Sequence, residues 1–374
     1  MSKKLKLAQE QAEVAIKETN KKIEELGNHT VALYDSLNAL QEQFDKIRNM
    51  PSDKKLEYEK LQKIRMEWKQ QAEKIEADYK KTTVKTAGKG AAGVGAGVAV
   101  VTMGPTAAMG VATTFGVAST GTAISSLSGA AATNAALAWL GGGALSAGGG
   151  GMAAGEAFLA LAGPVGWAIA GIALLGSGIM FFKAKSDQKR LENVFCLISE
   201  RDKRRYELAR VELSERIIRI IDENEHLGKA LEKTISFGTE YNSMTEAQQY
   251  ELGSYVNLMY ASTQLLVNPI MGLKPNYTES DLERYISSNQ DTCGSFCYEH
   301  KELMVSMCNL LYGIDMDETD KKLLSKSFRK NKKFLASSGI SKKEFKDSEI
   351  VFHVCEALNM LNRTVSDTKV RGVE

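Results

Sequence analysis

Residues 90–182 form a stretch of 93 residues with a single formally charged side chain, Glu156. The same stretch holds 22 of the 32 glycines of the chain. In water, a glycine inside a helix costs about 1 kcal/mol relative to alanine, so an isolated soluble helix is untenable here. In a bilayer, small residues instead let helix backbones approach closely. The composition therefore predicts that this segment contacts a membrane.

The segment divides into three apolar runs: 91–118, interrupted at Gly104 and Pro105; 130–140; and 157–182. About 20 residues of helix cross a hydrocarbon core, so the 26 uncharged residues of the last run are long enough to span one. Two pairs of glycines have the GxxxG spacing of packed transmembrane helices. The residues expected to insert are Gly93, Gly97, Gly151, Gly155, Trp167, Phe181 and Phe182.

Basic residues border the segment on both sides, with Lys85 and Lys89 before it and Lys183 and Lys185 after it. Under the positive-inside tendency both borders stay on one face of the membrane, so 91–118 and 157–182 are expected to form a hairpin. Glu156 has two interpretations. It is a functional charge within the membrane region, or, as we favour, an acid at a helix start where it suits the helix dipole.

Alanine and glycine are only weakly hydrophobic, which favours conditional over permanent insertion. An unstructured linker is disfavoured, because linkers lack the aliphatic clusters found here. A permanently buried soluble core remains an alternative.

Charged helices flank the apolar segment. The first is expected over 3–48, with an irregularity at Gly27 and Asn28, and a turn follows at 49–52. The second lies before the apolar segment, and so short a turn requires the two helices to run antiparallel. The apolar stripe of the first helix is Leu33, Leu37, Leu40, Phe44 and Ile47, and that of the second is Leu61, Ile64, Trp68, Ala72, Ile75 and Tyr79.

An amphipathic helix of some 35–40 residues is expected to return alongside this hairpin. Its apolar residues are Leu191, Val194, Ile198, Leu208, Val211, Leu213, Ile217, Ile220 and Ile221. The predicted fold is all-α: an elongated antiparallel coiled coil or helical bundle with an apolar hairpin and a small C-terminal helical domain. The predicted divisions are a coiled-coil hairpin over 1–86, the membrane-active segment over 87–185, the returning helix over 186–235 and the C-terminal domain over 236–374.

Net charge, cysteine content and the N-terminal sequence restrict the classes of function expected for this chain. A formal net charge of +2 argues against a nucleic-acid binder. Five scattered cysteines indicate a reducing compartment, and the N-terminus lacks the apolar core of a secretion signal, so synthesis in the cytoplasm and association with a membrane are expected. The basic stretch 321–333 is interpreted as a solvated helix face, with contact to anionic lipid or nucleic acid as the lesser alternative.

No enzymatic motif is visible, and no catalytic residue, cofactor or metal is predicted. Cys293, Cys297, His300 and Cys308 have a spacing unlike the paired ligands of structural zinc sites.

The block 119–155, with its Ala-Trp-Leu-Gly-Gly-Gly and Gly-Gly-Gly-Gly-Met-Ala-Ala-Gly motifs, resembles a glycine-zipper-like block of many uncharacterised bacterial proteins. This resemblance implies a bacterial origin. The layout of helical arms, central apolar hairpin and returning helix is similar to that of α-pore-forming toxins of the cytolysin A and haemolysin BL type, in architecture only.

The sequence thus predicts a protein that inserts into a lipid bilayer, forms a homo-oligomer and permeabilises the membrane, as a toxin or immunity effector. Two alternatives stay open. One is a non-lytic membrane-anchored scaffold that binds a protein partner through 236–374. The other is a soluble helical interaction protein with a buried apolar segment.

Overall fold

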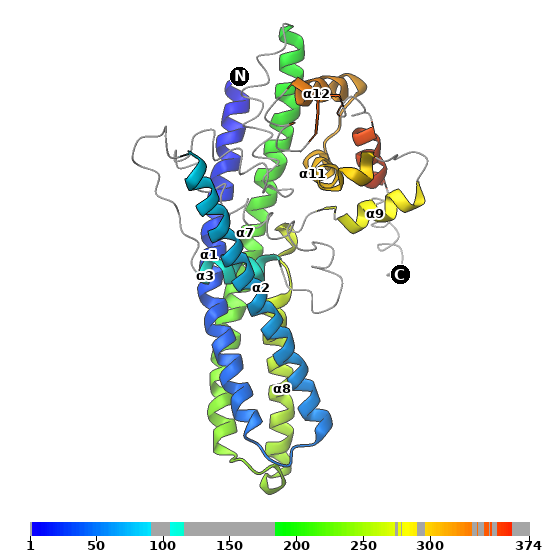
Figure 1. Cartoon of the computed structure of the whole chain (residues 1–374). Helices are drawn as coiled ribbons and strands as arrows, with labels where there is room; N and C mark the ends of the chain where they lie inside the picture. The colour runs from blue at the N-terminus through cyan, green and yellow to red at the C-terminus, as the bar shows by residue number, and fades with distance from the viewer. Residues whose placement is uncertain are drawn as a thin grey trace, which may run out of the picture.

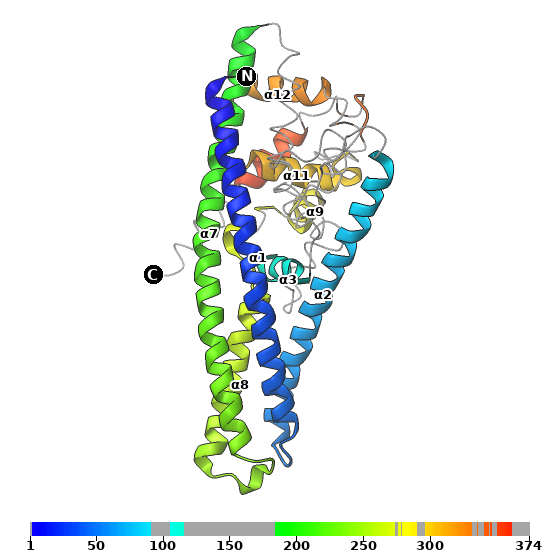
Figure 2. The same ribbon diagram turned by 90° about the vertical axis from the view of Figure 1, so that its left-hand side faces the viewer.

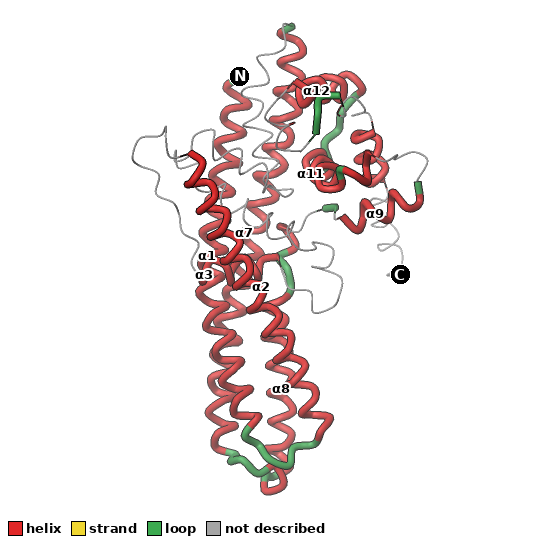
Figure 3. The backbone as a smooth tube through the Cα atoms, in the orientation of Figure 1, coloured by secondary structure: helices red, strands yellow, loops and turns green. Residues whose placement is uncertain are grey.

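The computed structural model describes residues 2–90, 105–115, 184–273, 276–277, 279–289, 296–330, 335, 340–343, 345 and 350–360. These residues form an elongated, all-helical molecule, and none of them belongs to a β-strand, so the predicted fold class is confirmed (Figures 1 and 3). The helices are α1 (Lys3–Asp45), α2 (Ser52–Gly90), α3 (Pro105–Phe115), α7 (Lys185–Ser236), α8 (Glu246–Val267), α9 (Glu279–Ser288), α11 (Lys301–Leu311) and α12 (Glu318–Lys330). Two 3₁₀ turns, η3 (Tyr241–Ser243) and η4 (Met271–Leu273), flank α8, and 350–360 is also helical.

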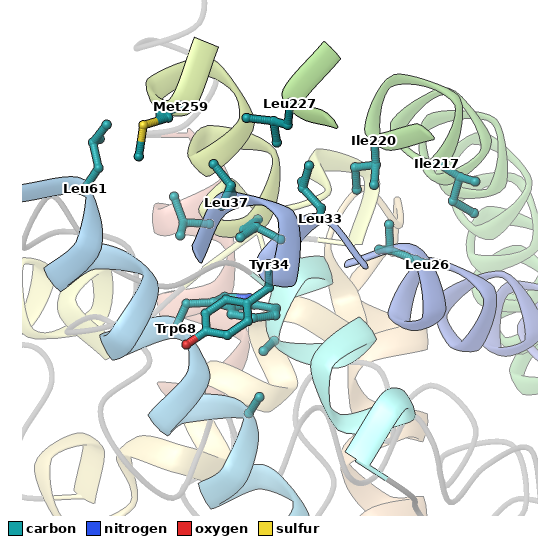
Figure 4. Close-up of a cluster of buried hydrophobic side chains, with 14 of the residues drawn as sticks. Leu26, Leu33, Tyr34, Leu37, Leu61, Trp68, Ile217, Ile220, Leu227 and Met259 are labelled. Carbon is teal, nitrogen blue, oxygen red and sulfur yellow. The ribbon is translucent and has the colours of Figure 1, made fainter. Parts of the chain in front are cut away.

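The narrow half of the molecule is a bundle of α1, α2, α7 and α8 (Figure 1). All five residues of the predicted α1 stripe are buried there. Leucines of α1 face α7 and α8, as Figure 4 shows for Leu33 and Leu37 beside Ile220, Leu227 and Met259. The stripe therefore packs as the heptad spacing requires.

Two turns are tied together at the tip of the bundle. The Arg48 amide donates to the Thr239 carbonyl at 2.9 Å, and the Tyr241 amide donates to the Arg48 carbonyl at 3.1 Å. Asn49, in the first turn, has a φ of 60°, the left-handed conformation that asparagine tolerates better than most residues. These hydrogen bonds hold the turn between α1 and α2 next to the turn between α7 and α8.

The helices of the bundle pair differently from the expected N-terminal hairpin. α1 and α2 do run antiparallel, but α1 packs along α7, and α2 diverges from α1 beyond the tip (Figure 2). α8 packs against α2 and α7, with Leu252, Met259 and Leu266 buried in the bundle core. The described helices that follow α8 form a second core cluster, which we call the C-terminal unit.

That C-terminal unit is built from α9, α11, α12 and 350–360, and its core is continuous with the first turns of α7 and α1. Arg190 of α7 pairs with Asp320 at 2.9 Å and with Asp317, at the start of α12. Arg201 donates to the carbonyls of Leu310 and Tyr312 at 2.9 and 2.6 Å. Two arginines therefore join the unit to the long helix.

α1 continues without a break through Gly27, which corrects the expected irregularity there. The glycine serves a contact with another helix, described below.

None of the described helices combines the length and hydropathy needed to cross a bilayer. The runs 130–140 and 157–182 lie outside the described residues. α2 ends and α7 begins in the half of the molecule opposite the tip (Figures 1 and 2). The two borders of the apolar segment therefore belong to the same end of the molecule.

Candidate functional site

The helix α3 is the described part of the first apolar run, and it lies inside the protein. It packs against α1 and α2, in the opening between these diverging helices (Figure 2). Ala108, Val111, Ala112, Thr113 and Thr114 are each at most 1% exposed. Eleven residues of the predicted membrane segment are thus held by the bundle, and we call this contact region the α3 site.

Two glycines let α3 approach α1 at backbone distance. A Cβ atom added to Gly27 would lie 2.0 Å from the Thr106 carbonyl oxygen, and one added to Gly110 would lie 2.1 Å from the Ile23 carbonyl oxygen. Neither obstacle is a side chain that can rotate away. The crossing therefore requires glycine on both helices, as in the close packing of small residues between membrane helices.

A backbone hydrogen bond from the segment after α8 holds the end of α3. The Ile270 amide, in the segment after α8, donates to the Thr114 carbonyl at 2.7 Å. The last carbonyls of a helix have no partner within the helix, so this bond satisfies one of them. Thr114 Oγ1 donates to the Gly110 carbonyl at 2.7 Å, whereas buried Thr113 Oγ1 has no hydrogen-bond partner among the described residues.

Aromatic side chains from α1 and α2 belong to the same core cluster as α3. The rings of Tyr34 and Trp68 lie with centroids 5.5 Å apart, and Trp68 is fully buried (Figure 4). Trp68 Nε1 has no hydrogen-bond partner among the described residues. Thr113 Oγ1 and Trp68 Nε1 are thus buried polar atoms without partners among the described residues, which makes the packing around α3 less favourable than that of an apolar core.

Arg65 of α2 is a buried cation in the same cluster of helices, with 0% exposure. Its guanidinium donates to Gln41 Oε1 at 3.0 Å and to Thr263 Oγ1 at 3.4 Å, and no carboxylate of the described residues lies within ion-pair distance. Burial lowers the pKa of Arg65 from 12.5 to about 10. Arg65 joins α1, α2 and α8, but at a desolvation cost.

Most residues predicted to act at the membrane fall outside the described part of the chain: Gly93, Gly97, Gly151, Gly155, Glu156, Trp167, Phe181, Phe182 and Lys183. Lys85 and Lys89 lie in α2, although their side chains are not described, and Lys185 is the exposed first residue of α7. The sequence pattern did not identify Gly27 and Gly110 as contact residues. The sequence signal for Gly27 was its position in the middle of a long heptad helix, where a glycine lowers helix stability unless it serves a close contact.

The cysteine-rich stretch does not form a metal site within the described residues, where no group of histidine, cysteine, aspartate or glutamate has suitable geometry. Cys297, Cys308 and Cys355 are buried in the C-terminal core, and Cys293 lies outside the described residues. The Sγ atoms of Cys308 and Cys355 are 2.8 Å apart, a proximity that sequence spacing did not predict.

Comparison with known protein families, with curated proteins and with solved structures found no match to this chain. The likeness to α-pore-forming toxins therefore rests on the layout of the sequence, and remains a prediction.

Proposed function

We propose that this protein inserts its Gly/Ala-rich segment into a lipid bilayer, oligomerises there and permeabilises the membrane, and that the α3 site holds the start of that segment before insertion. The observation that carries the proposal is the glycine contact of α3 with α1. It packs part of a bilayer-compatible sequence in the protein without large apolar side chains.

A segment that leaves a protein for a membrane must be held by interactions that are few and replaceable. α3 has only 11 residues, and its buried side chains are those of two alanines, two threonines and Val111, which bury little apolar area. The same small residues would allow close helix packing in lipid. The site therefore suits reversible storage better than a core of leucine and phenylalanine would.

Oligomerisation is supported by one face of α7. Leu197, Leu208, Val211 and Ile218 lie within a narrow arc of this helix, and their side chains are 37%, 70%, 59% and 65% exposed. The exposed charged residues Arg204 and Glu215 lie in the same arc, so this face mixes apolar and charged side chains, as surfaces between protein copies do. Cross-linking of the liposome-bound protein tests this part, which fails if only monomers are found.

The substitution Gly27→Ala tests the storage role of the α3 site. Its added methyl group would meet the Thr106 carbonyl, so α3 is expected to leave α1 more readily. In liposome flotation and dye-release assays, we expect the variant to release dye faster, or at a lower protein concentration, than the unchanged protein. A chain lacking 157–182 should release none.

Gly228→Ala is the matched control. It makes the same chemical change within a helix, but no atom lies within 4 Å of the added Cβ. It should behave like the unchanged protein or be slightly more stable, since alanine favours helix by about 1 kcal/mol. If the unchanged protein neither floats with liposomes nor releases dye, the membrane proposal is wrong. If it releases dye but Gly27→Ala does not accelerate release, storage at the α3 site is wrong.

The burial of α3 also favours a second candidate, a soluble helical interaction protein in which the apolar segment is a permanent core. In that case Gly27→Ala would lower the free energy of unfolding without producing flotation or leakage. The same pair of assays therefore separates the two candidates.

A further inference from the structure

A basic cavity of about 620 Å³ lies on the C-terminal unit, far from the α3 site in sequence. It lies between α12, the segment 341–343 and the helix 350–360. The described residues that line it are Glu318, Lys321, Lys322, Ser325, Lys326, Arg329, Lys330, Lys342, Phe352, His353 and Glu356. Its volume is in the range of cavities that hold small molecules.

The charges around this cavity are strongly unbalanced. Six of the lining side chains are cationic and two are carboxylates. Lys321 contacts both carboxylates, with its Nζ 2.8 Å from Glu318 and also paired with Glu356. These two contacts raise the pKa of Lys321 and keep it charged. The carboxylates are thus already engaged, and positive charge remains in excess.

Three of the remaining cations have no carboxylate within ion-pair distance in the described part of the chain: Lys322, Arg329 and Lys342. On α12, Lys322, Lys326 and Arg329 follow the spacing of a single helix face, where like charges repel each other. Such repulsion around a hollow is relieved by a bound anion.

Packing in the C-terminal core holds in place the helices that line the cavity. Leu323, Leu324 and Phe328, on the opposite side of α12, are buried in the C-terminal core, and Phe352 from the helix 350–360 is 6% exposed. The backbones that carry the cations are therefore held in place before a ligand arrives, which lowers the cost of binding.

We propose that this cavity binds a phosphate-bearing ligand with more than one negative charge. Phosphate groups carry up to two charges each and accept several hydrogen bonds from lysine and from the fork of an arginine guanidinium. A hollow formed by two helices and a short segment fits a compact ligand, either a soluble phosphate compound or the headgroup of an anionic phospholipid. The proposal does not depend on membrane insertion.

The test measures binding of inorganic pyrophosphate to the full chain by calorimetry at low ionic strength. A triple variant, Lys322→Gln with Arg329→Gln and Lys342→Gln, removes the three cations that lack carboxylate partners. Each contact between a charged group and phosphate is worth about 1.5 kcal/mol or more, so affinity should fall at least roughly tenfold. Circular dichroism checks that the variant keeps its helical content.

The control triple variant is Lys60→Gln with Lys63→Gln and Lys74→Gln, all exposed residues of α2. It makes the same change in net charge away from the cavity, and it should bind pyrophosphate as the unchanged protein does.

A second arm measures flotation with vesicles that contain phosphatidic acid, using the same three proteins. Cavity-dependent binding in the first arm supports a soluble ligand, and cavity-dependent flotation alone supports a lipid headgroup. No binding in either arm, or equal loss in the two triple variants, overturns the proposal.

Discussion

The guanidinium of Arg65 lies inside the bundle with amide and hydroxyl acceptors and, among the described residues, without a carboxylate. Its folded-state pKa of about 10 is below the ordinary 12.5, so the folded protein gives up this proton first as pH rises. The charged form therefore lowers stability at every pH below about 10, and the cost is relieved between about 10 and 12.5. Arg65 specifies how three helices meet and does so at the expense of stability.

Substituting Arg65 and its partner separately tests this account. Arg65→Met removes the buried charge, and we expect the free energy of unfolding at neutral pH to be unchanged or to rise by up to about 2 kcal/mol. Gln41→Leu leaves the guanidinium without its 3.0 Å acceptor and should cost about 1–3 kcal/mol. The double variant should recover most of that loss. A larger loss from Arg65→Met than from Gln41→Leu in urea denaturation would contradict the account.

Among helices, α7 and α11 are linked by hydrogen bonds from an arginine of α7. Arg201 donates to two carbonyls at the end of α11 and also pairs with Asp202 at 2.7 Å. Burial raises the pKa of Asp202, so removal of Arg201 alone would also leave a costly carboxylate. The variant that isolates the link between the helices is therefore Arg201→Met combined with Asp202→Asn.

In that double variant, amide hydrogen exchange in the last turn of α11 should become faster, because two charged hydrogen bonds worth about 1.5–3 kcal/mol each are lost. Exchange at the bundle tip, near Arg48, should not change. Arg204→Met is the control, because Arg204 is exposed and its guanidinium donates to the Glu200 carbonyl of its own helix. Equal exchange in α11 for both variants would show that Arg201 does not hold the unit.

Helix prediction from sequence succeeded where a stripe of large side chains had to be buried. The heptad positions of α1 are buried whichever helix covers them, so periodicity was sufficient there. The pattern does not say which helix provides the cover, so it did not indicate that α8 packs against α2 and α7. On α7, Leu208, Val211 and Ile221 were counted toward one apolar face, but they are 70%, 59% and 49% exposed.

The α3 site shows a different limit of sequence analysis. Alanine, glycine and valine are compatible both with a bilayer and with a tightly packed core, so composition alone did not indicate that part of the run 91–118 is buried in the bundle. The contact between Gly27 and Gly110 depends on two positions 83 residues apart, and no local pattern joins them. Only the packed helices bring them together.

For the whole molecule, the central claim is that a helical bundle stores the start of an apolar segment and releases it to a membrane. The described helices are consistent with storage: α1 and α2 leave an opening for α3, and the segment begins and ends at the same end of the bundle (Figures 1 and 2). The helix α12, which lines the basic cavity, also lies in this half of the molecule (Figure 1).

The most direct test follows the Ile270 amide, whose hydrogen-bond acceptor is the Thr114 carbonyl of α3. Residue-resolved hydrogen exchange is measured with and without liposomes that the protein permeabilises, with the Asn268 amide, bonded to the Gln264 carbonyl at 3.0 Å, as the internal control. Release of α3 predicts that exchange at Ile270 accelerates roughly tenfold, since the lost bond and its burial are worth about 1–2 kcal/mol, while Asn268 is unchanged. Unchanged protection of Ile270 while the liposomes leak would contradict the account.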